Sequence, residues 1–182
     1  MKKFTQVKAG KYFNKVLSGT PDIYWKLQNA WSDNFNRWYC CDGFRGYRIE
    51  SEPIGATEWL DNGHPYDIFK ADYDKTRLFI ESVFDRKSVF DETIPIEVNF
   101  DEVLSIAKKD KKAVIDLGEN YPCVNAQYLR EAMELFPDGK VYCNNGARRM
   151  FLPIYIVSDY GIAFIYPIRR ENKLHWKYNE SA

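Results

Sequence analysis

The sequence predicts a mixed α+β domain in which two halves repeat the order strand, helix, strand, strand, strand. Amphipathic helical patterns lie near both ends of the 182-residue chain. Each is followed by three segments rich in aromatic and β-branched residues, which favour strands. A less regular segment separates them. We therefore expect half 1 at about 1–51, an inserted or expanded middle at 52–120, half 2 at 121–170 and a polar tail at 171–182.

Half 1 begins with an amphipathic helix predicted over residues 8–17. One face carries the apolar side chains of Ala9, Phe13, Val16 and Leu17, and the opposite face carries Lys8, Lys11 and Lys15. Gly19 and Pro21 are typical of a helix end. Strands are predicted to follow at 23–28, 37–41 and 46–51.

Half 2 is predicted as a strand at 121–124, a helix capped by Asn125, and strands at 140–144, 152–157 and 162–168. Glu131 and Glu134 are expected on the solvent-facing side of that helix. In the middle segment we predict strands at 76–84 and 93–98, a helix at 101–109 and a strand at 113–117. The two halves share this plan but no matching residues.

Composition excludes several classes of protein. The chain carries 26 Lys and Arg against 26 Asp and Glu, so contact with nucleic acid would depend on a local patch. Apolar residues make up 45%, yet no run approaches the ~20 apolar residues of a membrane span. The four cysteines lack the spacing of a disulfide framework, which fits a reducing cytoplasm. We expect a soluble, cytoplasmic protein without membrane association.

Three short motifs occur in the order and with the spacing of one known family. Residues 40–45 read Cys-Cys-Asp-Gly-Phe-Arg, residues 124–132 read Val-Asn-Ala-Gln-Tyr-Leu-Arg-Glu-Ala, and residues 165–169 read Ile-Tyr-Pro-Ile-Arg. They resemble the Ala-Thr-Asp-Gly-His-Arg loop, the Phe-Asn-x-x-Tyr-Leu run and the Val-Met-Pro-Met-Arg strand of the bacterial DNA-polymerase sliding clamp (beta subunit) family. The resemblance covers residues 121–169 best, residues 1–51 weakly and the middle not at all.

The resemblance implies a clamp-like fold and a non-enzymatic accessory protein of DNA replication, with a mobile element as a suggested source. In clamps the first and last motifs help to form an apolar pocket for peptide motifs of polymerases and other replication partners. Carried over, the peptide-binding residues are Cys41, Gly43, Phe44 and Arg45 on one side, and Tyr166, Pro167, Ile168 and Arg169 on the other.

Two departures from the family affect this expectation. Phe44 replaces the family's His and Tyr166 replaces its first Met, so the accepted peptide is expected to differ. Clamps also take the two motifs from neighbouring domains of a three-domain chain, whereas this short chain carries both. A closed ring would therefore need a homo-oligomer.

The lysine face of the first helix is the predicted DNA-binding surface. Lys8, Lys11 and Lys15 can meet the phosphates of duplex DNA without reading sequence, as a sliding protein requires. An ordinary solvated face explains the same pattern. The alternative function is a protein-interaction or inhibitor module that mimics a clamp surface without touching DNA.

Catalytic and metal sites receive little support from the sequence. Cys40 and Cys41 alternate along a strand and so face opposite sides, which disfavours their ligating one zinc ion together. Only His64 and His175 are available to complete a site. A hydrolase using Cys41 or Cys143 is a third hypothesis, and stacking of the aromatic cluster at 24–39 on exposed bases is another alternative. We expect no enzymatic activity and no cofactor.

Overall fold

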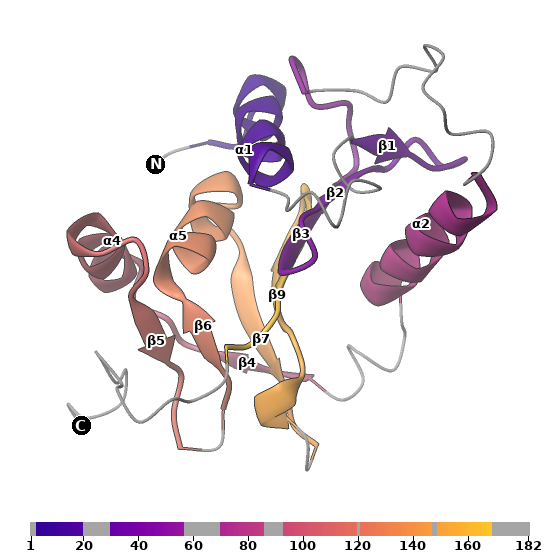
Figure 1. Cartoon of the computed structure of the whole chain (residues 1–182). Helices are drawn as coiled ribbons and strands as arrows, with labels where there is room; N and C mark the ends of the chain where they lie inside the picture. The colour runs from indigo at the N-terminus through magenta and orange to yellow at the C-terminus, as the bar shows by residue number, and fades with distance from the viewer. Residues whose placement is uncertain are drawn as a thin grey trace.

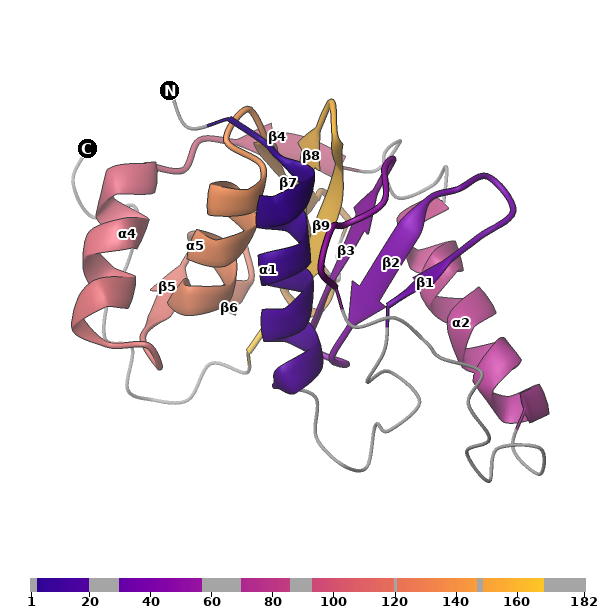
Figure 2. The ribbon, with the colours of Figure 1, turned by 90° about the horizontal axis from the view of Figure 1, so that it is seen from above.

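The main body of the protein is a sheet covered by helices on both faces. The computed structural model describes residues 3–19, 30–56, 70–85, 93–119, 121–146 and 149–168. Helices α1 (Gln6–Ser18), α4 (Phe100–Lys109) and α5 (Ala126–Leu135) lie side by side on one face, and α2 (Lys70–Asp85) covers the other (Figures 1 and 2). The predicted α+β class is confirmed.

The helices begin at side chains that cap their first amides. Thr5 Oγ1 accepts a hydrogen bond from Lys8 N, Asn99 accepts from Asp101 N and Glu102 N, and Asn125 accepts from Tyr128 N. These short polar side chains satisfy amides that have no partner within a helix. None of the helices in the described segments has the length and apolar character that crossing a bilayer requires.

The large sheet has seven antiparallel strands in the order β1-β2-β3-β9-β8-β7-β4. Its strands are β1 (Trp31–Ser32), β2 (Trp38–Cys41), β3 (Arg45–Ile49), β4 (Thr93–Ile96), β7 (Lys140–Asn144), β8 (Ile154–Ser158) and β9 (Gly161–Ile165). A second sheet pairs β5 (Val114–Asp116) with β6 (Cys123–Asn125), and a short 3-10 helix, η3 (Arg149–Phe151), precedes β8.

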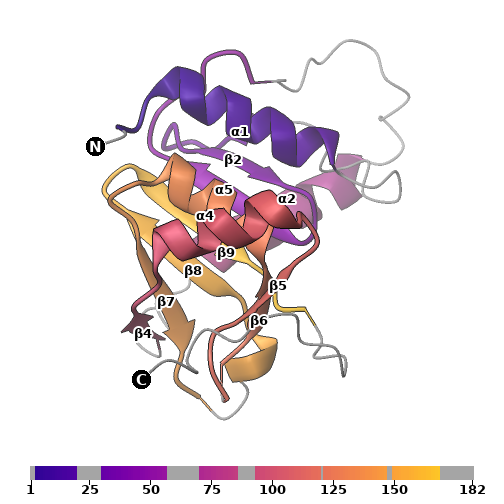
Figure 3. The same cartoon turned by 90° about the vertical axis from the view of Figure 1, so that its left-hand side faces the viewer.

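Apart from the edge strand β4, the strand order is symmetric about the pair β3–β9. Helix α1 leads to β1, β2 and β3, and helix α5 leads to β7, β8 and β9. The last strands of the two units pair antiparallel, with Tyr47 opposite Ala163 at the middle of the register. Both helices pack on the same face of the sheet (Figure 3). From each helix onward the two units share the order helix, strand, strand, strand, although in half 1 the first of these strands is β1 and not the strand predicted at 23–28. β6 precedes α5, whereas the described residues before α1 form no strand.

Alternation along the strands divides the core into two clusters, one on each face of the sheet. Cys40, Tyr47 and Ile165 point to the face under α1 and α5, where they pack with Phe13 and Leu129. Tyr39, Cys41 and Phe164 point to the other face and pack against Ile80, Val83 and Phe84 of α2. Cys40 and Cys41 thus lie on opposite faces, as predicted.

The middle of the chain is more regular than expected and is part of both sheets. β4 pairs with β7 at the edge of the large sheet, and β5 pairs with β6 of the second half. The predicted strand at 76–84 is wrong, because these residues belong to α2. Its aromatic and β-branched residues favour a strand, but Ile80, Val83 and Phe84 have helical i, i+3, i+4 spacing and bury one face against the sheet.

Most of the other predicted elements are present with small shifts at their ends. β7 begins and ends at the predicted residues, and α4 extends the predicted helix by one residue. The predicted strand at 23–28 and the polar tail at 171–182 lie outside the described residues. The two-residue β1 was not predicted.

Candidate functional site

The pairing of β3 with β9 brings the first and last sequence motifs together. Arg45 lies opposite Ile165, and the next amide along, Tyr166 N, donates to Phe44 O at 2.8 Å. Phe44 is 47% exposed and Ile168 is 39% exposed. We call Phe44, Tyr166, Pro167 and Ile168 the apolar surface.

A tight turn between β2 and β3 presents Phe44. Asp42 Oδ1 accepts hydrogen bonds from Phe44 N and Arg45 N, both at 2.8 Å. Asp42 N donates to Arg45 O at 3.1 Å, and Gly43 has a φ of 88°, a conformation that favours glycine. The Asp-Gly pair of the motif is therefore required by the turn that carries the exposed ring.

Arg45 lies beneath this surface and not on it. Its side chain is 6% exposed, with Nε 3.2 Å from Asp42 Oδ2 and Nη1 2.5 Å from Glu131 Oε2. The guanidinium also lies 4.2 Å from the centre of the Tyr128 ring. Cys41 is buried as well, and its Sγ accepts from Gly43 N at 3.2 Å. Of the four residues predicted on this side, Phe44 is the one with an exposed side chain.

Glu131 completes a buried cluster of charges. Besides Arg45, its carboxylate is bound by Lys15 Nζ at 3.1 Å and by Gln127 Nε2 at 2.5 Å. We call Asp42, Arg45 and Glu131 the buried ion cluster; Lys15, whose side chain is 36% exposed, binds it from the edge. The prediction that Glu131 faces solvent is wrong, because α5 turns this side chain toward α1 and the turn, leaving it 5% exposed.

Burial and ion pairing act in opposite directions on the two carboxyl groups of the cluster. Burial raises the pKa of Asp42, and the charge of Arg45 only partly opposes it. Burial also acts to raise the pKa of Glu131, but Arg45, Gln127 and Lys15 together bring that pKa below its usual value. Glu131 is therefore the more firmly ionised of the two.

The second side of the apolar surface follows the end of β9. The Tyr166 ring packs edge-on against Phe164 at 5.4 Å, and Ile168 N donates to Cys123 O at 2.8 Å, which ties this segment to β6. Tyr166 and Pro167 are half-buried. Arg169 lies outside the described residues.

The three lysines of α1 differ in their surroundings. Lys11 is exposed and Lys8 is half-buried. Lys15 is bound to Glu131 and lies 4.7 Å from the centre of the Tyr12 ring. The helix therefore does not present three equivalent solvated cations, and Lys11 is the member most available to a phosphate group.

The cysteines lie in apolar surroundings. All four are buried and free, and burial raises the pKa of Cys41 and of Cys143 to about 12. The thiols of Cys41 and Cys143 therefore remain protonated at neutral pH, which disfavours the hydrolase hypothesis because the thiolate is the nucleophile. In the described part of the chain, no group of three or more His, Cys, Asp or Glu side chains is placed to hold a metal ion. His64 and His175 lie outside that part.

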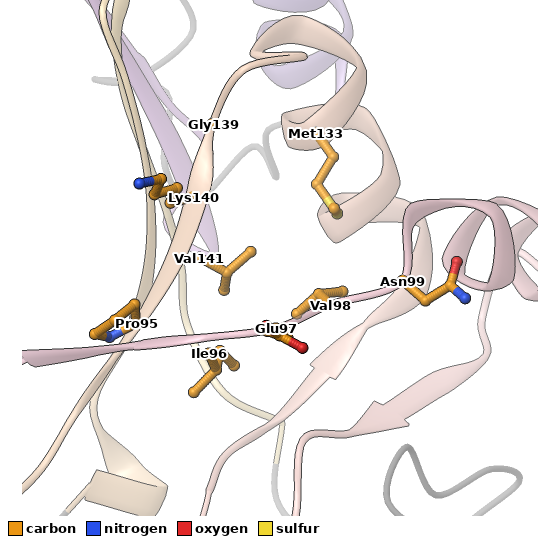
Figure 4. A pocket seen from close by; sticks show the side chains of 9 residues that line it. All are labelled: Pro95, Ile96, Glu97, Val98, Asn99, Met133, Gly139, Lys140 and Val141. Carbon is orange, nitrogen blue, oxygen red and sulfur yellow. The ribbon is translucent and has the colours of Figure 1, made fainter. Parts of the chain in front are cut away.

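A hollow of about 800 Å³ lies away from the apolar surface, between β4, α5 and β7. Figure 4 shows Val98, Met133 and Val141 around it. It forms because the pairing of β4 with β7 stops at Ile96 and Val141, after which residues 97–99 turn away to begin α4. None of the described residues of the three sequence motifs lines this hollow.

Comparison with protein-family models, with curated proteins and with solved structures finds no match to this chain. The functional interpretation therefore depends on the geometry described above and on the sequence motifs.

Proposed function

We propose that this chain is a clamp-like, non-enzymatic accessory protein of DNA replication that binds short apolar peptide motifs of replication partners at the apolar surface. The observation that carries the proposal is the hydrogen bond from Tyr166 N to Phe44 O, which joins the two motifs in one chain. The symmetric strand order also supports it, since two units of one plan meet at β3 and β9.

The chemistry of the surface favours an apolar ligand held by a rigid support. The Phe44 ring is half exposed above a turn with two backbone hydrogen bonds to Asp42, so little ordering is needed when a peptide binds. Aromatic side chains of this kind commonly contribute most of the energy of an interface. Phe44 is accordingly the residue that we expect to dominate binding.

Fluorescence anisotropy with short labelled peptides that tile a bacterial replicative DNA polymerase tests this function. We expect Phe44→Ala to lower the affinity for the tightest-binding peptide about tenfold or more. Phe35→Ala is the matched control, because Phe35 is 79% exposed in the β1–β2 turn, away from the apolar surface. Equal affinities for wild type and Phe44→Ala, or no binding peptide at all, would reject the proposal.

Contact with duplex DNA is the second part of the proposal, and Lys11 is the residue on which it depends. Charge reversal of Lys15 would also disturb Glu131, so Lys11→Glu is the cleaner variant. We expect it to weaken duplex binding and to reduce the salt dependence by about one phosphate contact. Lys75→Glu, on the opposite side of the sheet, is the control.

The outcome with Lys11→Glu separates the two functions left open by the sequence. A loss of DNA affinity with unchanged peptide affinity supports the clamp-like replication protein. Peptide binding without any DNA affinity supports the interaction or inhibitor module.

A homo-oligomer, which a ring requires, is proposed to use surfaces other than the sheet edges. At one edge, Pro95 of β4 has no N–H with which to bind a further strand. At the other edge, Arg77 Nη2 of α2 donates to Ser32 O of the short β1 at 2.9 Å. Light scattering coupled to size-exclusion chromatography measures the oligomeric state.

A further inference from the structure

The carboxylate of Glu131 binds side chains from three parts of the fold. Oε2 accepts from Arg45 Nη1 of the β2–β3 hairpin at 2.5 Å. Oε1 accepts from Lys15 Nζ of α1 at 3.1 Å and from Gln127 Nε2 of α5 itself at 2.5 Å. A carboxylate with all these donors in a site that is 5% exposed is held in one orientation.

Arg45 transmits this fixed orientation to the turn. Its Nη1 binds Glu131, and its Nε lies 3.2 Å from Asp42 Oδ2. The other oxygen of Asp42 accepts the amides of Phe44 and Arg45. An unbroken chain of charged hydrogen bonds therefore runs from α5 to the amide of the exposed Phe44.

We propose that Glu131 is the positioning residue of the apolar surface, acting through Arg45 and Asp42 to hold the turn that presents Phe44. The inference rests on the proposed peptide-binding function. Hydrogen bonds lead from Glu131 to Phe44 through Arg45 and Asp42, and the motif at 124–132, which contains Glu131, assigns it no role.

The charges of the cluster explain why Glu131 is required in addition to Asp42. Lys15 and Arg45 are balanced by Asp42 and Glu131. Without the charge of Glu131, the buried Arg45 keeps Asp42 as its charged partner and gains by turning toward water, while Lys15, which is 36% exposed, is already partly solvated. Asp42 Oδ2 would then lose its bond with the Arg45 side chain. The turn would be held only by the bonds of Asp42 Oδ1 with the amides of Phe44 and Arg45 and by the bond from Asp42 N to Arg45 O.

Amide hydrogen exchange, measured by NMR on the whole chain, tests this inference without a peptide. We expect Glu131→Gln to speed exchange at Phe44 N and Arg45 N about tenfold or more. Amides in β7 should keep their wild-type rates. Unchanged exchange at Phe44 and Arg45 in a folded Glu131→Gln protein would overturn the inference.

Glu134→Gln is the matched control. Glu134 lies on the same helix and accepts hydrogen bonds from Tyr12 Oη and from Arg130 Nε, at 3.1 Å for the latter, whereas Glu131 accepts from Arg45, Lys15 and Gln127. We expect it to leave the two turn amides unchanged. Acceleration of those amides by Glu134→Gln to the same extent would show a general loosening of α5 and would also overturn the inference.

Two further measurements keep the test decisive. If Glu131→Gln does not fold, Glu131→Asp retains the charge with a shorter reach, and we expect a smaller acceleration at the same two amides. With the best polymerase peptide as probe, Glu131→Gln should weaken binding several-fold and Glu134→Gln should not. If wild type binds no peptide, the proposed function fails, while the exchange result still decides whether Glu131 holds the turn.

Discussion

The described part of the protein contains two clusters of arginines and carboxylates whose central carboxylates, Glu131 and Asp85, differ in burial. In the buried ion cluster, the side chains of Asp42, Arg45 and Glu131 are 2–6% exposed. The outer ion cluster, formed by Asp33, Arg37, Arg48 and Asp85, links α2 to the β1–β2 hairpin and β3. Its Asp85 is 38% exposed and accepts from Arg37 Nη1 at 3.1 Å and Arg48 Nη1 at 2.5 Å.

The difference shows that similar ion pairs in one protein serve different purposes. In the outer cluster, Asp33 is 8% exposed, but water reaches Asp85 and can replace a partner that is removed from it, so the pairs of Asp85 add little to stability. In the buried cluster, water cannot replace a lost partner, and every charge depends on the others. A complete buried ion cluster adds little net free energy to folding, but it fixes the orientation of its side chains. We therefore assign the positioning role to Glu131.

The largest effect is expected when Arg45 is replaced by Met. The change leaves Asp42 and Glu131 buried without their shared cation, which costs about 3–5 kcal/mol of unfolding free energy. Urea unfolding followed by circular dichroism measures the loss. A loss below about 1 kcal/mol would mean that water reaches the cluster and that the contrast between the two clusters is wrong.

A smaller change in the free energy of unfolding is expected when the pH is lowered. The pKa of Glu131 is lower in the folded state than its usual 4.5, so its contribution is complete above that pH and is lost as the pH falls through the folded-state pKa. Asp42 has the opposite sign: its raised pKa makes the folded state bind a proton first, so its contribution is present at low pH and is lost as the pH rises.

The difference in unfolding free energy between wild type and Glu131→Gln isolates the contribution of Glu131 to the pH dependence of stability. We expect this difference to be largest at neutral pH and to shrink as the pH falls below about 4.5. Urea unfolding of both proteins at several pH values measures it. A difference that is constant with pH would show that Glu131 is not the ionised partner of Arg45.

Periodicity and capping predicted most of the fold, since α1, α5 and β7 have clear apolar patterns and clear ends. Helix α2 was missed because the residue types at 76–84 favour a strand, while its apolar spacing fits a helix packed on a sheet. The pairing of β3 with β9 joins residues far apart in the sequence, and no local pattern predicts it. The family resemblance did predict that the motifs at 40–45 and 165–169 contribute to one pocket.

The candidate site was predicted only in part. Motif matching named Phe44 and Ile168, which are exposed, but also Cys41 and Arg45, which are buried. Glu131 was missed because a glutamate between apolar positions of a helix looks solvent-facing. The signal that could have found it is Arg45 itself: an arginine following an Asp-Gly turn into a core strand needs a buried acid from another element.

The smallest change in unfolding free energy is expected from a substitution in the outer ion cluster. Asp85→Asn removes the carboxylate shared by Arg37 and Arg48, but Arg37 keeps Asp33, with Nη2 and Oδ2 2.6 Å apart, and Arg48 keeps Glu50 at 3.1 Å. We expect the unfolding free energy to fall by less than about 1 kcal/mol, and by less still in high salt, which screens exposed charges. Urea unfolding at low and high salt measures both. A loss as large as that of Arg45→Met would show that α2 depends on Asp85 to stay on the sheet, and burial would then not be what distinguishes the two clusters.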